Sequence, residues 1–241
     1  MARAGIPLLA VLIDADNSSP QWAEAIFNEI ASLGEASVRR IYGDFSRPAL
    51  KGWSDRLAPL ALVPHHSPAN TVGKNASDIA LVIDAMDLLH SGRFDGFVLV
   101  SSDSDFTRLA SRIREQGLDV YGIGQEKTPE AFRKACKRFI FVENIEGTGQ
   151  GDDGRGAGAV RKPGKQAAQK AVPLIEAAMR AIGGEDEWYS LGQLGQYIIA
   201  ANPDFDTRSF GSAKLSDLVT RSGRFETRRG EGNQILVRAK G

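Results

Sequence analysis

The stretch Val98-Leu99-Val100-Ser101-Ser102-Asp103-Ser104-Asp105-Phe106 passes from an apolar run through two aspartates into a helical pattern. The apolar run predicts a strand at 96–101 that is buried on both faces, because no polar residue alternates within it. The helical pattern continues over residues 106–116. The same order occurs near the start of the chain, where a predicted strand at 8–13 runs into Asp14. A strand followed by a helix is the repeating unit of α/β domains, which is the fold class that we expect.

Strand and helix patterns alternate over the first 145 or so residues. The spacing predicts further strands at 36–42, 60–63, 119–123 and 139–142. It predicts further helices at 21–33, 49–57, 77–89 and 129–137. This alternation indicates βαβ units, and therefore a mostly parallel sheet sandwiched by helices on its two faces.

The composition changes after residue 146. Residues 147–170 are rich in Gly, Ala, Gln, Lys and Arg, and Val160 is their only large apolar residue. Such a segment buries too little apolar surface to order itself, so we predict a flexible linker between domains at 1–146 and 171–241. Its basic residues could touch phosphates, but we favour a solvated tether.

The last 70 residues predict a small second domain. Apolar residues at helical spacing predict a helix that begins near Val172 and ends at Gly183-Gly184. A second helix is expected from Ser190 to Ala200 and a third at 214–220. Two β-leaning runs, 224–228 and 234–238, then flank a Gly-rich turn and predict a hairpin. Three helices followed by a hairpin indicate a winged helix-turn-helix domain.

Composition narrows the class of protein. The chain has 241 residues, with 30 Lys and Arg against 30 Asp and Glu, so any nucleic acid must be engaged by local patches. Cys136 is the only cysteine, which excludes an internal disulfide and fits a reducing compartment. The apolar run at the N-terminus lacks a signal-peptide pattern and reaches a carboxylate too soon to span a membrane. We therefore expect a cytoplasmic protein with no membrane partner.

Three aspartates are expected to meet at one edge of the predicted sheet. Asp14 and Asp103 each follow a strand, and functional groups of such sheets gather at the carboxyl ends of the strands. Asp78 stands near the start of a predicted helix, on an apolar stripe that should face the sheet. The other members of that stripe are Val82, Ala85 and Leu89. We expect Asp84 and Asp87 on the opposite, solvated side.

An acidic pocket of this kind predicts a divalent cation. Clustered carboxylates repel one another, and Mg²⁺ or Mn²⁺ prefers oxygen ligands, keeps several waters and bridges to phosphate. Each acid also has a structural interpretation: Asp14 could merely end a strand, and Asp78 could be an acid at a helix N-terminus that the helix dipole favours. Asp105 is equally compatible with a fourth ligand and with a helix N-cap. For Asp16, beside Asn17, a turn residue is the favoured interpretation.

The motifs around these acids resemble the NYN domain, a branch of the PIN-like nuclease superfamily. The resemblance lies in three stretches, Val11-Leu-Ile-Asp14-Ala-Asp16-Asn17, Lys74-Asn-Ala-Ser-Asp78 and Val98-Leu-Val-Ser101-Ser102-Asp103-Ser-Asp105. It implies a central parallel sheet and a metal-dependent ribonuclease site. It places metal ligands at Asp14, Asp78 and Asp103, and it adds Asp105 as a further catalytic acid. It matches Asn17 to an asparagine that would orient a ligand or a phosphate, and Lys74 to a basic residue that could contact a phosphate. We also expect Ser101 and Ser102 to contact the substrate.

The second domain resembles the OST-HTH, or LOTUS, domain. The resemblance rests on Ser190-Leu-Gly-Gln-Leu-Gly195, on residues 205–211 and on Lys214-Leu-Ser-Asp-Leu218. It implies a module that binds RNA or a protein partner. The hairpin carries Arg224, Arg228 and Arg229, which could track a phosphate backbone. A merely soluble hairpin tip is an equal alternative, because Glu226 and Glu231 dilute the charge.

Several other residues carry weaker hypotheses. His65 and His66 are predicted in a loop, where a phosphate contact is conceivable but simple exposure is favoured. Trp53 could stack a base, although a packing role is favoured. Cys136 has no obvious catalytic partners, so we interpret it as a packed helix residue.

The leading hypothesis is a ribonuclease dependent on Mg²⁺ or Mn²⁺. The alternative is a non-catalytic RNA-binding regulatory protein whose acidic pocket binds metal without turnover. A weaker third hypothesis is a phosphatase or DNA nuclease that uses the same carboxylates.

Overall fold

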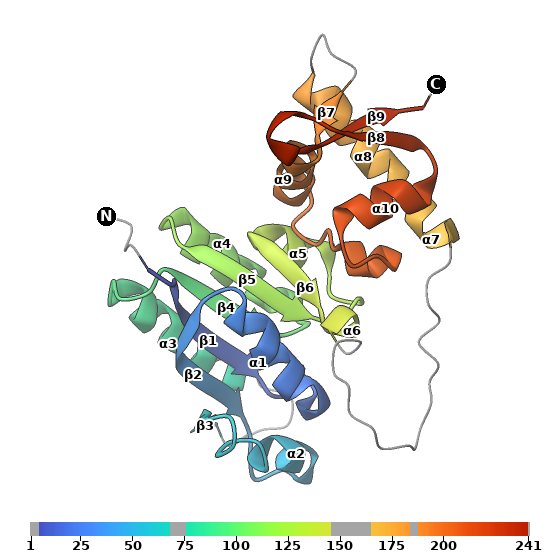
Figure 1. Cartoon of the computed structure of the whole chain (residues 1–241). Helices are drawn as coiled ribbons and strands as arrows, with labels where there is room; N and C mark the ends of the chain where they lie inside the picture. The colour runs from blue at the N-terminus through green and yellow to red at the C-terminus, as the bar shows by residue number, and fades with distance from the viewer. Residues whose placement is uncertain (1–4, 68–75, 146–164, 184–187, 241) are drawn as a thin grey trace. The chain divides into compact units, whose positions relative to one another are not determined.

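The computed structural model describes residues 5–67, 76–145, 165–183 and 188–240. The chain divides into two compact units, Met1–Gln150 and Gly151–Gly241 (Figure 1).

The N-terminal unit is built on a six-stranded parallel sheet in the order β3-β2-β1-β4-β5-β6 (Figure 1). The strands are β1 (Leu8–Asp14), β2 (Glu35–Gly43), β3 (Val63–His66), β4 (Gly96–Val100), β5 (Asp119–Gly124) and β6 (Arg138–Phe141). The chain moves outward from β1 to β3 and then returns to β4 on the other side of β1. The strand order therefore reverses between β1 and β4, where a doubly wound sheet opens a crevice at its carboxyl edge.

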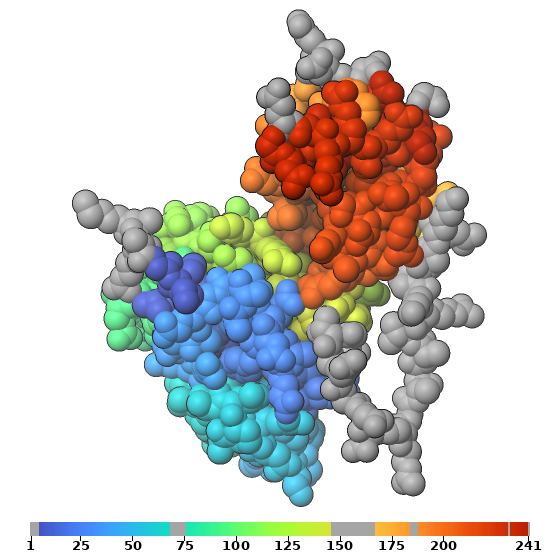
Figure 2. Space-filling model, in the orientation of Figure 1, coloured from blue at the N-terminus to red at the C-terminus, as the bar shows by residue number. Residues whose placement is uncertain are grey.

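Helices cover both faces of this sheet. They are α1 (Ala23–Ala31), α2 (Lys51–Ser54), α3 (Ala76–His90), α4 (Thr107–Glu115), α5 (Glu130–Ala135) and α6 (Val142–Ile145). One core contains apolar side chains of α3, α4 and α5, and the other contains those of α1, α2 and α6. Figure 2 shows the outer surface of this unit, on which the segments from β1 to α2 are blue to cyan.

The central strand β1 is buried on both faces, which explains why its sequence shows no polar alternation. Ala10 and Leu12 pack into the core on the α3 side, whereas Leu9, Val11 and Ile13 pack into the core on the α1 side. Because side chains alternate along a strand, Asp14 points to the same side as Ala10 and Leu12. The α/β fold with a parallel sheet between helices is thus confirmed.

Two predicted elements of this unit differ in the structure. The strand expected at 60–63 is β3, Val63–His66, at the edge of the sheet. An edge strand tolerates Pro64, which has no backbone N–H to donate. The helix expected at 49–57 is a 3₁₀ helix, Pro48–Leu50, followed by the short α2.

The C-terminal unit contains helices packed against a small antiparallel sheet of order β7-β9-β8. Its elements are α7 (Lys165–Gln169), α8 (Val172–Ile182), β7 (Tyr189–Ser190), α9 (Leu191–Ala201), η5 (Thr207–Phe210), α10 (Leu215–Ser222), β8 (Phe225–Arg229) and β9 (Ile235–Ala239). The expected hairpin is formed by β8 and β9, in which Thr227 pairs with Val237.

The boundary of this unit differs from the predicted one. Helix α7 occupies residues that we assigned to the linker, and Ala168 and Ala171 are fully buried in the core of the unit. The linker prediction is wrong for these last residues, and its part at 147–164 lies outside the described residues. Within the described ranges, every helix is too short or too polar to cross a membrane.

Candidate active site

Asp14 is a buried carboxylate at the carboxyl end of β1. Its side chain is 1% exposed. One oxygen, Oδ2, accepts a hydrogen bond from Ser101 Oγ at 2.7 Å. The other accepts from the backbone N–H groups of Asp16 and Asn17, at 3.1 and 3.2 Å. Burial raises the pKa of Asp14, against the lowering effect of hydrogen bonds from Ser101 and from the side chain and backbone of Asn17.

Ser101 joins Asp14 to Asp103. Strands β1 and β4 are neighbours, with Ile13 opposite Val100, so the residues that follow the two strands lie at the same edge of the sheet. The Ser101 hydroxyl donates to Asp14 and accepts from the backbone N–H of Asp103 at 3.0 Å. One hydroxyl group therefore positions both strand-end acids, a role beyond the substrate contact that the sequence suggested for it.

Asp103, and not Asp105, is the helix cap. It is the N-cap of the 3₁₀ helix η3 (Ser104–Phe106), and its Oδ1 accepts from the backbone N–H of Asp105 at 2.9 Å. Asp105 lies inside the first turn of η3 and is exposed. The N-cap interpretation of Asp105 is therefore wrong, while its role as a further catalytic acid stays a prediction.

Asp78 completes the group from the first turn of α3. It is half-buried, and its pKa is raised to about 6. Desolvation is the largest cause, followed by the negative charges of four neighbours, which are Asp14, Asp103, Asp16 and Asp105. A carboxylate feels such repulsion only from charges that lie near it. The structure thus brings Asp78 together with the two strand-end acids.

The chemistry of these donors fits a hard divalent cation. All of them are carboxylates, the ligands that Mg²⁺ and Mn²⁺ prefer, and a cation would neutralise the repulsion that raises the pKa of Asp78. Among the residues that the structure describes, no three His, Cys, Asp or Glu side chains are already arranged to hold one ion.

Asp16 and Asn17 form the turn after β1. Asp16 is exposed, and its carboxylate accepts from Ser77 Oγ at 3.4 Å and contacts Arg47 Nη1 at 3.4 Å. It therefore connects the turn to the start of α3. Asn17 is exposed beside Asp14 and hydrogen-bonds its carboxylate. Lys74, the other polar residue expected against the substrate, lies outside the described residues.

Asp84 is more buried than its place in the sequence predicted. Its side chain is only 17% exposed, where we expected a solvated acid. It accepts hydrogen bonds from Arg40 and from the hydroxyl of Tyr42, both on β2. Burial and the neighbouring Asp84 carboxylate raise the pKa of Tyr42. Asp87 is exposed, as expected.

The two histidines lie in strand β3 and not in a loop. The ring of His65 packs on Tyr42 with centroids 4.9 Å apart, and its Nε2 is 4.0 Å from Asp84 Oδ2. His66 Nδ1 accepts a hydrogen bond from the backbone N–H of Phe45 at 3.2 Å. His65 is therefore partly buried and not simply exposed, whereas His66 is exposed, as expected.

The burial of Trp53 and of Cys136 decides between the roles considered for each residue. Trp53 is fully buried, and its indole Nε1 donates to the carbonyl of Ser18 at 3.1 Å, so it packs and does not stack a base. Cys136 is fully buried, and burial raises its pKa to about 12, as expected for a packing residue.

The C-terminal unit presents its basic hairpin to solvent. Arg224, Arg228 and Arg229 are exposed. The guanidinium carbon of Arg228 lies 4.2 Å from the ring centroid of Trp188, and that of Arg238 lies 4.8 Å from it. Cation–π contact of this kind holds the hairpin arginines over the aromatic ring.

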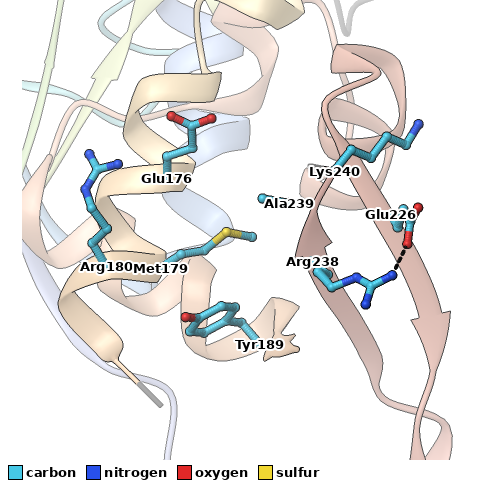
Figure 3. Close-up of a pocket in the computed structure, with 8 residues that line it drawn as sticks. All are labelled: Glu176, Met179, Arg180, Tyr189, Glu226, Arg238, Ala239 and Lys240. Atoms are coloured by element: carbon cyan, nitrogen blue, oxygen red, sulfur yellow. Dashed lines mark hydrogen bonds and ion pairs between the residues drawn. The ribbon is translucent and has the colours of Figure 1, made fainter. Parts of the chain in front are cut away.

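A cavity of about 620 Å³ opens between α8 and the sheet of this unit (Figure 3). Its lining combines Met179 and Tyr189 with charged side chains of both signs. Arg238 is paired with Glu226 at 2.7 Å across the hairpin. The mixed charges do not select one class of ligand.

Comparison with known proteins matches each unit to one family. The NYN domain matches residues 8–143, and the OST-HTH/LOTUS domain matches residues 165–237. No curated protein matches the chain.

Two solved structures are similar to parts of the chain. A crystal structure of a protein of unknown function from Vibrio parahaemolyticus is 19% identical, with a TM-score of 0.49, and the match covers 59% of this chain and 96% of that one. A solution structure of an uncharacterized protein from Nitrosomonas europaea is 28% identical, with a TM-score of 0.28, over 39% of this chain and 91% of that one. These likenesses add no weight to the assignment. On the family match over more than half of its length, the chain belongs to the NYN domain family, with an OST-HTH/LOTUS domain following the NYN domain.

Proposed function

We propose that this protein is a ribonuclease that hydrolyses RNA phosphodiester bonds with the help of Mg²⁺ or Mn²⁺. The observation that carries the proposal is the gathering of carboxylates at the carboxyl edge of the sheet, where the Ser101 hydroxyl joins Asp14 to Asp103. The raised pKa of Asp78, whose causes include the charges of these acids, supports it. An NYN domain indicates a nuclease-type hydrolase, and an OST-HTH/LOTUS domain is an RNA-binding domain.

The acids would have two roles, as ligands of the ion and as a positioning group. Asp14, Asp78 and Asp103 would hold the ion, and Asp105 would help to position it or the attacking water. When bound, such an ion activates water and stabilises the oxygen that leaves the phosphodiester. Ser101 keeps Asp14 and Asp103 in place, and buried Asp14 needs this support, because a lone buried carboxylate is costly.

Polar residues around the acids would contact the RNA backbone. Ser102 Oγ accepts from the backbone N–H of Gln125 at 3.0 Å, so its hydroxyl hydrogen is the group that would be offered to a phosphate. Asn17 would orient Asp14 or a phosphate, and Lys74 would supply a positive charge. The role of Lys74 is proposed from its place in the motif alone.

The winged-helix domain would capture RNA for the nuclease domain. Arg224, Arg228 and Arg229 would follow the phosphate backbone, and the segment between the domains would act as a tether that raises the local concentration of RNA at the acids. We place the protein in the cytoplasm. The same domain would also bind a protein partner.

The decisive experiment compares RNA, DNA and a small phosphoester as substrates with Mg²⁺, with Mn²⁺ and with excess chelator. We expect cleavage of RNA with either metal, no cleavage in chelator, and none by Asp14→Asn or Asp103→Asn. Asp87→Asn, which changes an exposed acid of the same α3 helix, is the matched control and should cleave normally. Undiminished cleavage by Asp103→Asn, or in chelator, would show that the site assignment is wrong.

The second candidate function is RNA binding without turnover. The observation that favours it is that no three potential ligands in the described ranges are in place around one ion. Tight RNA binding with no cleavage under any of these metals would select it. Cleavage of DNA or of the small phosphoester in preference to RNA would select the third hypothesis.

A further inference from the structure

Two large aliphatic side chains are exposed on helix α3 beside the acids. Ile79 is 61% exposed and Ile83 is 58% exposed. They are four residues apart, so they lie on one face of the helix, one turn from each other. Single exposed apolar residues are common, but a pair on one face creates a continuous apolar surface.

This surface forms a wall of a cavity that also contains two of the acids. The cavity has a volume of about 240 Å³ and is lined by Asp78, Ile79, Val82, Ile83, Asp105 and Phe106. The described residues that line it include no Lys or Arg. In the part of the chain that the structure describes, it is therefore an apolar hollow flanked by carboxylates.

Along α3, the acid comes first and the apolar wall extends away from it. Asp78 is in the first turn, and Ile83 follows five residues later, which corresponds to roughly 7.5 Å along a helix axis at 1.5 Å per residue. That length is comparable to one nucleotide of an RNA strand. A phosphate held at the acids would thus have its own nucleoside beside the isoleucines.

We propose that Ile79, Val82 and Ile83 form a subsite for the nucleobase next to the scissile phosphate. The subsite rests on the proposed nuclease function, because the acids fix where the phosphate goes. A base is neutral, with apolar faces, so it gains by leaving water for an apolar wall. A second phosphate is a poor occupant, since Asp78 and Asp105 would repel it.

This assignment distinguishes two kinds of RNA contact. Contacts to phosphates weaken as salt rises, because cations are released from the RNA on binding. Burial of a base against aliphatic side chains involves no ion release, so the contribution of the subsite is independent of salt. It is also absent for a sugar–phosphate strand that has no bases.

The test compares Ile79→Ser/Ile83→Ser with Ile6→Ser in the full-length chain, each combined with Asp103→Asn so that RNA stays intact. Ile6 is 71% exposed and precedes β1, at the amino edge of the sheet and away from the acids. Binding is measured by fluorescence anisotropy with a short RNA and with an abasic strand of equal length, at two salt concentrations. Thermal unfolding and sedimentation velocity check the fold and the oligomeric state.

We expect the double substitution to weaken RNA binding about tenfold at both salt concentrations, because the base loses the apolar surface that it buries. Binding of the abasic strand should stay unchanged, and Ile6→Ser should behave like its parent. An equal loss on both strands, no loss on either, or loss of a dimer on substitution would overturn the subsite. In the active protein, the substitutions should raise KM and spare kcat. Absence of cleavage by the unsubstituted chain would refute the nuclease function, while the binding comparison would still decide whether the wall receives a base.

Discussion

Asp103 combines two roles that a substitution can separate. Its Oδ1 accepts the backbone N–H of Asp105 as a helix cap, while its charge contributes to the repulsion on Asp78. The first role needs only an oxygen acceptor. The second needs a negative charge, as does the proposed binding of a cation.

We predict that Asp103→Asn abolishes cleavage and leaves the free energy of unfolding nearly unchanged, because Asn caps helices as well as Asp. Asp103→Ala should also abolish cleavage, and it should lower the free energy of unfolding by about 1 kcal/mol through loss of the cap. Urea denaturation and an RNA cleavage assay measure the two effects. Equal stability of the Asn and Ala variants would contradict the capping role.

The raised pKa of Asp78 predicts an unusual dependence of stability on pH. Its pKa is about 6 in the folded protein and 3.8 for the unperturbed group, so between these values the folded state binds more protons than the unfolded state. Stability that depends on this group therefore falls as pH rises from about 4 to about 6. Above that range the ionised Asp78 destabilises the metal-free fold.

Asp78→Asn should consequently stabilise the metal-free protein at pH 7 while abolishing cleavage. Because Asp78 is partly exposed to solvent, we expect a gain of roughly 1 kcal/mol, which should vanish near pH 4. Thermal unfolding in chelator, from pH 4 to pH 8, measures this difference. Asp87→Asn is the control and should show no such trend. A variant that is less stable than the wild type at pH 7 would refute the electrostatic origin of the shift.

At the scale of elements, α3 joins the candidate site to the sheet through a polar contact. Asp84 accepts from Arg40 and Tyr42 of β2, and the ring of His65 on β3 covers Tyr42. These residues lie on neighbouring strands, since Tyr42 pairs with Asp14 on one side and with His65 on the other. The contact therefore fixes the helix that carries Asp78 over the strand that ends in Asp14.

We predict that Asp84→Asn lowers the free energy of unfolding by about 1–2 kcal/mol, because it leaves a partly buried Arg40 without its counter-charge. Asp87→Asn, on the exposed side of the same helix, should change it by less than about 0.5 kcal/mol. Chemical denaturation of both variants provides the comparison. Equal effects would show that the Arg40 contact contributes nothing to the stability of α3.

Much of the fold follows from the sequence, and each wrong prediction has a physical cause. Fully apolar runs predicted the central strands, but β3 was misplaced because an edge strand carries Pro64 and polar residues. Helix α7 was missed because it packs through small residues such as Ala168. Asp84 was misplaced because apolar residues cover most of the circumference of α3, so periodicity alone selected no single face.

The candidate site was more predictable than the contacts around it. Strand ends and one helix start placed Asp14, Asp103 and Asp78 near one another, as the repulsion on Asp78 indicates. The cap at Asp103 could not be foreseen, because η3 begins at Ser104, two residues before the expected helix. Hydrogen bonds that link different strands, such as Ser101 to Asp14, depend on strand order, which periodicity does not specify.

At the scale of the whole molecule, the formal net charge of zero means that RNA must be attracted locally. Without a bound cation, the acids of the NYN domain would repel phosphate. Arg224 and Arg229 on the exposed hairpin are the complementary positive charges in the OST-HTH/LOTUS domain. If the hairpin captures RNA, its arginines should set binding and its dependence on salt, while the acids set the rate of cleavage.

We therefore predict that Arg224→Ala/Arg229→Ala raises KM for RNA, leaves kcat unchanged and reduces the salt dependence of binding. Loss of two phosphate contacts to a single strand should lower the slope of log affinity against log salt by about 1.4. The measurement is RNA binding by the Asp103→Asn form across a salt series, together with steady-state cleavage by the active form. Arg112→Ala/Lys134→Ala removes two exposed cations of the NYN domain whose ion pairs with Glu115 and Glu130 contribute little to stability, and it serves as the charge-matched control. An unchanged slope in the hairpin variant, or an equal change in the control, would show that the hairpin does not follow the RNA backbone.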